Sequence, residues 1–189
     1  MSAPFTLMVS AGTYHLPFNR LGDWISRWMQ SHPEAQVIYQ HGPGIPISGA
    51  ENRVIIPADE LMELFAAADA VVLQGGAGGV MDLRAIQRIP LVVPRHPELN
   101  EVIDTHQLLF TEKASALGLV HRADEEHQLH DLLDQAVAGE LKTRCGVAER
   151  TEGISQGVAV LNRLPQKLSM LTTFKRLASS ILPVARSLR

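Results

Sequence analysis

Four glycines gather within five residues of the stretch VVLQGGAGGVMDL, residues 71–83, where a β-branched apolar run gives way to a helical pattern. Gly75, Gly76, Gly78 and Gly79 would let backbone N–H groups approach an anion closely, and the following helix would add the positive end of its dipole. Such a site suits a diphosphate and needs no lysine. The alternative is a βα turn in which the glycines only supply positive φ angles.

Two common nucleotide motifs do not fit this stretch. A P-loop requires a lysine followed by serine or threonine after its last glycine, and no such lysine follows here. A dinucleotide fingerprint read from Gly76 and Gly78 places Met81 where the third glycine belongs, and the stretch lies in mid-chain. The sequence therefore predicts an anion site of a different kind.

Short apolar runs alternate with helical patterns along the chain. Strands are predicted at 5–10, 35–39, 52–57, 70–74, 89–94 and 119–122. Helices are predicted at 20–30, at 59–68 with Asp59 as cap, from Gly79, up to Gly118, and from Asp124 to Gly139. Because two of the strands are apolar on both faces, they belong inside a sheet. The fold class is therefore α/β, a Rossmann-like doubly wound parallel sheet, whose ligands bind outside the carboxyl ends of the strands.

Composition and charge divide the chain into two parts. The 189 residues are 46% hydrophobic and include one cysteine, Cys145, so no disulfide framework is expected. No signal peptide or long apolar span is evident, which predicts a cytoplasmic location.

Residues 163–189 hold six basic residues and no acidic one, although the net charge of the whole chain is −3. We expect a domain at 1–162 and a basic amphipathic helix at 163–189.

Two motifs at a consistent separation resemble a known family. The segment ADAVVLQGGAGGVMDLRAIQRIPLVVP, followed by DTHQ, resembles the donor-binding half of GT-B glycosyltransferases of family 28. The opening VSAGTYHLPFNRL is similar to that of small bacterial exopolysaccharide glycosyltransferase subunits. It is equally similar to the catalytic subunit of the two-piece dolichol-pathway N-acetylglucosaminyltransferase. The resemblance covers roughly residues 5–140 and implies one half of a GT-B fold.

The resemblance implies a role for each loop of the donor site. Gly76, Gly78 and Gly79 would present N–H groups to the donor diphosphate, where charge develops as the nucleotide leaves. Gly12 and Thr13, on the loop after the first strand, would approach the same diphosphate. The nucleotide site is thus expected to lie between two loops.

Further roles fall on four side chains. Asp82 would bind the ribose hydroxyls, with a carboxylate in the first turn of a helix as the alternative. His106 and Gln107 would lie near the donor sugar and diphosphate, with a solvated helix start as the alternative. His15 is the candidate catalytic base, because its loop should face the cleft.

Two departures from the family pattern bear on catalysis. Gln74 stands where the family usually has histidine, and Gly79 where it usually has serine. Glutamine donates a hydrogen bond to phosphate but carries no charge, so binding can survive while transfer is weakened. Arg84, Arg88 and Arg95 lie near the site in sequence and could assist a diphosphate, with surface charge as the simpler interpretation.

The expected function follows from the resemblance. The chain would be the donor-binding, catalytic subunit of an inverting, metal-independent glycosyltransferase that uses a UDP-sugar as substrate, with no metal and no cofactor. The partner would be a membrane-anchored acceptor-binding subunit carrying a polyprenyl-linked acceptor, and no nucleic acid is expected. The basic tail would dock on that partner, on the inner face of the membrane, or on its own domain. A non-catalytic nucleotide-sugar-binding module and a sugar-nucleotide epimerase fragment are the alternatives.

Overall fold

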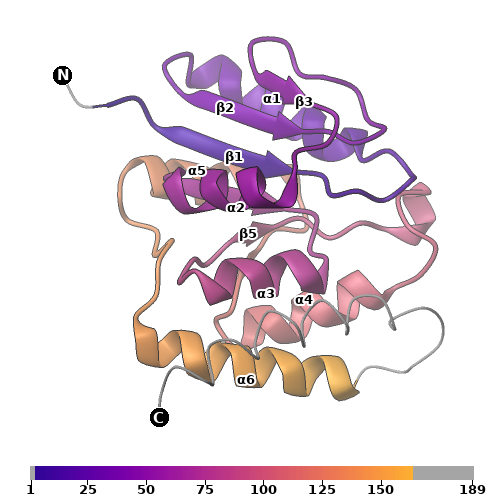
Figure 1. Cartoon of the computed structure of the whole chain (residues 1–189). Helices are drawn as coiled ribbons and strands as arrows, with labels where there is room; N and C mark the ends of the chain where they lie inside the picture. The colour runs from indigo at the N-terminus through magenta and orange to yellow at the C-terminus, as the bar shows by residue number, and fades with distance from the viewer. Residues whose placement is uncertain (1–2, 164–189) are drawn as a thin grey trace.

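Six parallel strands form one sheet in the computed structural model, which describes residues 3–163 (Figure 1). They are β1 (Thr6–Ser10), β2 (Gln36–Gln40), β3 (Glu51–Arg53), β4 (Ala70–Leu73), β5 (Leu91–Val92) and β6 (His121–Arg122). The order β3-β2-β1-β4-β5-β6 is that of a doubly wound sheet. The predicted fold class is confirmed, and β4 and β5 lie inside the sheet as expected. The strand order reverses between β1 and β4, which places a crevice there.

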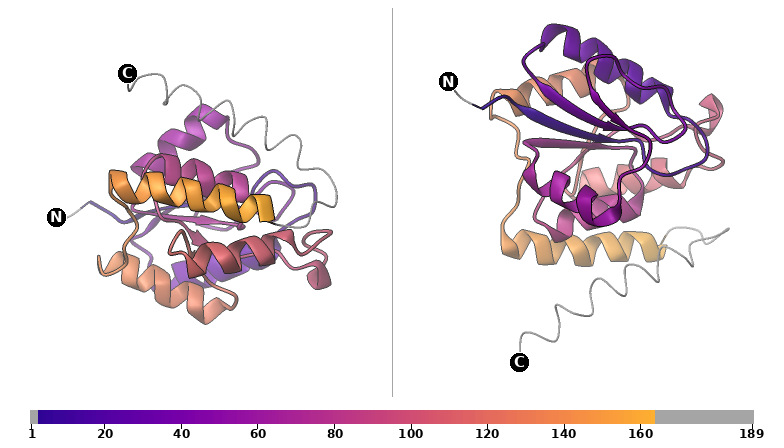
Figure 2. Two further views of the ribbon diagram at one scale, coloured as in Figure 1. Left: turned by 90° about the horizontal axis from the view of Figure 1, so that it is seen from below. Right: turned by 45° about the horizontal axis from the view of Figure 1, so that its top comes forward.

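Helices cover both faces of the sheet (Figure 2). Leu7 and Val9 of β1 belong to a core shared with α1 (Asn19–Ser31) and α5 (Glu126–Val137). Met8, which points the opposite way, belongs to a second core with α2 (Ala58–Ala67), α3 (Ala77–Ala85) and α4 (His106–Ala116). Successive side chains of the buried strand β1 therefore pack against the helices on opposite faces of the sheet.

Several predicted boundaries were wrong by a few residues. The strand expected at 52–57 ends at Arg53, and β5 comprises only two residues. Helix α3 begins at Ala77, two residues before the predicted start at Gly79. Gly78 and Gly79 therefore lie within the first turn of the helix and not in the loop before it.

The predicted caps are right at helix ends and wrong at helix starts. Gly118 and Gly139 follow α4 and α5 with φ of +66° and +72°, as a left-handed C-terminal position requires. Asp59 is the second residue of α2 and not its cap. Glu125, not Asp124, caps α5 through a capping box with Gln128, because the Asp124 carboxylate is held by Arg122.

One helix was not predicted from the sequence. Helix α6 (Val147–Arg163) packs on α3 and α4 (Figures 1 and 2). Gly153 and Gly157 lie buried on its inner face and allow the close approach. The predicted amphipathic tail helix lies outside the described residues apart from Arg163, which ends α6.

Candidate functional site

The loops after β1 and β4 meet at the point where the strand order reverses. Ser10 and Leu73 are register partners at the carboxyl ends of these strands. Gly12 follows with φ of +78°, and a Cβ atom built there would lie 2.4 Å from Gln74 Nε2. A Cβ atom at Gly76 would lie 2.9 Å from the same nitrogen. The Gln74 side chain therefore fills the space between two glycines, and a larger residue at position 12 would displace it.

The start of α3 faces the same crevice. Gly76 is its N-cap residue and no side chain caps the helix. The backbone N–H of Val80 donates to the Gly76 carbonyl oxygen at 3.2 Å and closes the first turn. The N–H groups of Ala77, Gly78 and Gly79 precede this bond and are the groups that a helix leaves for an external acceptor.

The alternative explanation of the glycines holds for only one of the four. Gly75 has φ of +81°, whereas Gly76 has φ of −65° and Gly78 and Gly79 are helical. Three of the glycines are thus not required by backbone conformation. Close packing accounts for two of them, since a Cβ atom at Gly76 would lie 2.9 Å from Gln74 Nε2 and one at Gly79 would lie 3.3 Å from Leu73 Cδ1.

The end of a third strand, β5, also lies at the site. A Cβ atom at Gly75 would lie 2.6 Å from Thr111 Cγ2 and 3.6 Å from Pro94 Cα. The loop after β4 therefore lies directly against α4 and the end of β5. The structure brings the loops that follow β1, β4 and β5 to one edge of the sheet, as predicted.

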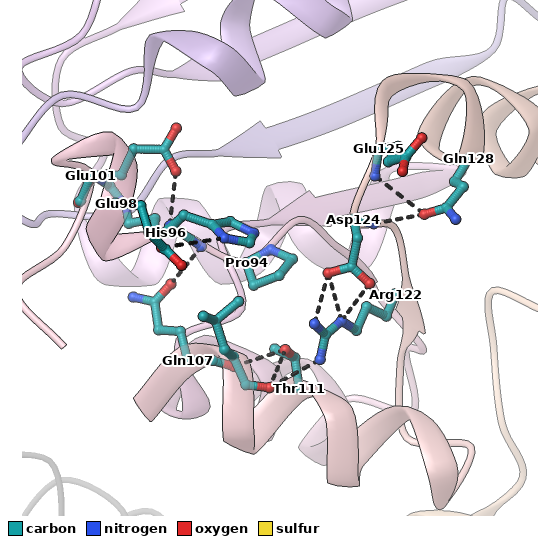
Figure 3. Close-up of polar contacts among 12 residues, drawn as sticks. Pro94, His96, Glu98, Glu101, Gln107, Thr111, Arg122, Asp124, Glu125 and Gln128 are labelled. Atoms are coloured by element: carbon teal, nitrogen blue, oxygen red, sulfur yellow. Dashed lines mark hydrogen bonds and ion pairs between the residues drawn. The ribbon is translucent and has the colours of Figure 1, made fainter. Parts of the chain in front are cut away.

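The His106 and Gln107 pair begins α4 at this edge. His106 Nδ1 lies 3.0 Å from Asp104 Oδ1. The Gln107 side chain extends toward Pro94 and His96 (Figure 3), and its Oε1 accepts a 3.3 Å hydrogen bond from the Arg95 backbone N–H. Both side chains are partly buried.

The three remaining candidates are exposed. Thr13 and His15 lie on the loop after β1, where the His15 ring is 4.4 Å from the ring of Tyr14. Asp82 is the sixth residue of α3. Because the helix begins at Ala77, Asp82 is in its second turn, and the alternative of a first-turn carboxylate was wrong.

The interpretation of three arginines as surface charge was also wrong. Arg84, Arg88 and Arg95 are at most 3% exposed. The Arg88 guanidinium donates to the carbonyl oxygen of Ala68, which precedes β4 and lies at the end of the sheet away from the site. Arg84 donates to the Glu149 carbonyl oxygen near α6. Only Arg95 belongs to the loops described above.

Arg95 was noted in the sequence as lying near the site, but its burial there was not predicted. The Arg95 side chain is completely buried at the candidate site, and this burial lowers its pKa to about 10. The available signal was its position directly after the apolar strand IPLVVP, where the chain reaches the carboxyl edge of the sheet.

Residues 3–163 contain neither a metal-binding cluster nor a membrane-spanning helix. In that range no cluster of three or more His, Cys, Asp or Glu side chains has the geometry of a metal site. Over the same range no helix combines the length and apolar character needed to cross a bilayer.

Comparison with known families agrees with this geometry. The family model named glycosyltransferase family 28 C-terminal domain matches residues 6–158. The chain belongs to this family. It has the Rossmann-like fold of one domain of the GT-B enzymes, as the sequence resemblance implied.

More distant relatives are larger proteins. A segment of 76 residues, 39% of this chain, is 30% identical to the UDP-N-acetylglucosamine--N-acetylmuramyl-(pentapeptide) pyrophosphoryl-undecaprenol N-acetylglucosamine transferase of Rubrobacter xylanophilus and covers 22% of it. Among solved structures, the glycotransferase of kitacinnamycin aligns with a TM-score of 0.57 at 16% identity, over 84% of this chain and 40% of that one. MurG of Acinetobacter baumannii aligns with a TM-score of 0.50 at 13% identity, over 85% and 46%. The chain spans less than half of each.

Proposed function

We propose that this family 28 domain is the donor-binding, catalytic half of an inverting, metal-independent glycosyltransferase. It would take a UDP-sugar at the carboxyl edge of β1, β4 and β5 and transfer the sugar to a lipid-linked acceptor. The observation that carries the proposal is the start of α3, which has no side-chain cap and faces Gly12 across the crevice. A helix N-terminus next to glycine backbone suits a diphosphate without a cation.

The choice of substrates is supported by the curated relative. Its name specifies a UDP-sugar donor and an undecaprenol-linked acceptor, and it is 30% identical to this chain over 76 residues. The nucleotide would lie along α3 with its ribose toward Asp82. His106 and Gln107 would then lie beyond the first phosphate, near the sugar.

The acceptor side of the reaction needs a second domain. The described residues form one doubly wound sheet, whereas the solved relatives are more than twice as long as the part that aligns. We expect the acceptor-binding half to be a membrane-anchored partner, with His15 as the candidate base in the cleft between the two. The tail at 164–189 would contribute to docking.

Calorimetric titration with UDP in the presence of EDTA tests the donor site. We expect binding between millimolar and micromolar Kd, because helix N–H groups replace the metal as the partner of the diphosphate. Repeating the titration with magnesium or manganese should change the Kd little. Affinity that appears only after metal is added would show that the helix account of the site is wrong.

A second candidate function is favoured by Gln74. This side chain lies against Gly12 and Gly76 at the place where a charged histidine is usual in the family. A glutamine there is compatible with a module that binds the nucleotide sugar without transferring it. A transfer assay with the partner and its acceptor separates the two functions, because the module would bind UDP and yield no product.

A further inference from the structure

Arg95 is buried at the candidate site and has no role in the proposed transfer. We propose that Arg95 is a positioning residue that fixes the 12–15 loop against the donor site. The inference rests on the proposed function for its consequence and on the structure for its geometry. In this proposal the buried Arg95 guanidinium determines where Gly12, Thr13 and His15 lie.

The guanidinium of Arg95 holds both ends of this loop. Nη2 donates a 2.8 Å hydrogen bond to the carbonyl oxygen of Ala11, directly before the loop. Nη1 donates to the carbonyl oxygens of Leu16 at 2.9 Å and Pro17 at 3.2 Å, directly after it. The four residues 12–15 are thus closed between two anchor points on a single side chain.

The same side chain ties the loop to the rest of the site. Nη1 also donates to the Glu101 carbonyl oxygen at 2.8 Å, in the segment after β5. The guanidinium carbon lies 4.6 Å from the centre of the Phe18 ring and 5.7 Å from that of Tyr14. The Arg95 backbone N–H donates to Gln107. Arg95 therefore connects the loops after β1 and β5 with the start of α4.

The contacts of the guanidinium are suited to fixing the backbone of the loop. The guanidinium donates its hydrogen bonds to backbone carbonyl oxygens, and the Glu101 carboxylate is paired with Arg20 at 2.8 Å. A planar fork of five N–H donors has a geometry that no apolar side chain and no lysine reproduces. Loss of this side chain would leave the four carbonyl oxygens without their donor and would also lower stability, so the test must include readouts that report on the loop itself.

The test compares Arg95→Met and Arg95→Lys with the wild type of the full chain. We expect UDP to bind about 10- to 100-fold more weakly to each variant, because a displaced loop misplaces the groups that would contact the diphosphate. The affinity for UMP, which lacks the terminal phosphate that the 12–15 loop would contact, should fall by less than about threefold. Hydrogen exchange at residues 11–17 should accelerate in both variants, while exchange in β1 and β4 stays slow.

The matched control is Arg88→Met. Arg88 is equally buried, its pKa is likewise lowered to about 10 by burial, and it also donates to a backbone carbonyl oxygen, but at the opposite end of the sheet. Its loss should leave UDP affinity and exchange at 11–17 unchanged. If Arg95→Met does not fold, Arg95→Lys, which keeps the charge, decides the matter by the same readouts.

The outcomes separate this inference from the proposed function. Failure of the wild type to bind UDP overturns the function, and hydrogen exchange at 11–17 still tests the positioning. Unchanged protection of the loop in the variants overturns the positioning, as does an equal loss of UDP and UMP affinity.

Discussion

At the scale of single residues, the candidate site depends on one contact between two loops. Gly12 and Gln74 are 62 positions apart in the printed sequence, and no Cβ atom fits between them. Sequence patterns identified both positions but did not show that they touch. They also did not show that Arg95 is enclosed, because burial depends on which loops close over a side chain.

Gly12→Ala should weaken UDP binding by at least about 10-fold, because a small displacement of a positioning group has effects of this size or larger. The new methyl group would displace Gln74, and alanine is strained at φ of +78°. Calorimetry measures the change. Gly139→Ala is the control, since Gly139 has φ of +72° with no atom near its Cβ position. Equal UDP affinity in the two variants would contradict the assignment of Gly12.

Gln107→Ala and Asp82→Ala should differ in their ligand dependence. Gln107 would lie beyond the first phosphate, so its loss should weaken UDP-sugar binding more than UMP binding. Asp82 would contact the ribose, which both ligands share, so its loss should weaken both by about 1 kcal/mol, the scale of a hydrogen bond. Parallel titrations with the two ligands measure this. Equal losses of UDP-sugar and UMP affinity in the Gln107 variant would show that this side chain does not lie near the sugar.

At the scale of elements, the pattern of strand and helix was predictable and the exact starts were not. Apolar runs determine which segments are buried in the sheet, and Gly118 and Gly139 mark helix ends because their left-handed backbone favours glycine. Caps at helix starts depend on side-chain competition, as the engagement of Asp124 with Arg122 shows. Helix α6 was missed because its buried face contains two glycines in place of large apolar residues.

Gly157→Ala should destabilise the domain by about 1 kcal/mol, the difference between a cost of about 2 kcal/mol for overpacking the core and a gain of about 1 kcal/mol in helix propensity. Its Cβ atom would lie 2.4 Å from the sulfur of Met81, which is itself buried in α3. Urea unfolding measures the difference. Ser155→Ala, on the exposed face of α6, is the control and should change stability by less than about 0.5 kcal/mol.

At the scale of the whole molecule, the described residues supply one half of a two-domain architecture. The donor loops lie at 12–15, 74–79 and 104–107, all well before α6. The basic segment at 164–189 has a different charge balance from the rest of the chain, with five basic residues and no acidic one. We therefore expect residues 3–163 to bind the donor and residues 164–189 to dock on the partner or the membrane.

Removal of residues 164–189 should leave UDP affinity within about twofold of the full chain. The same truncation should abolish sugar transfer and membrane association, because the tail would supply the docking area and the attraction to an anionic surface. Co-sedimentation with membranes that contain the partner, alongside UDP titration, measures both effects. A truncated chain that unfolds or loses UDP would show that the tail belongs to the core of this domain.

The location of the donor diphosphate is the central claim, and amide NMR during a UDP titration in EDTA tests it most directly. We predict that the largest shifts fall on Gly12, Thr13, Gly76, Gly78 and Gly79, with smaller ones at His106 and Gln107. Amides at the amino ends of the strands and around Arg88 should not move. Saturable UDP binding that shifts amides at another edge of the sheet, and leaves the start of α3 unchanged, would contradict the account.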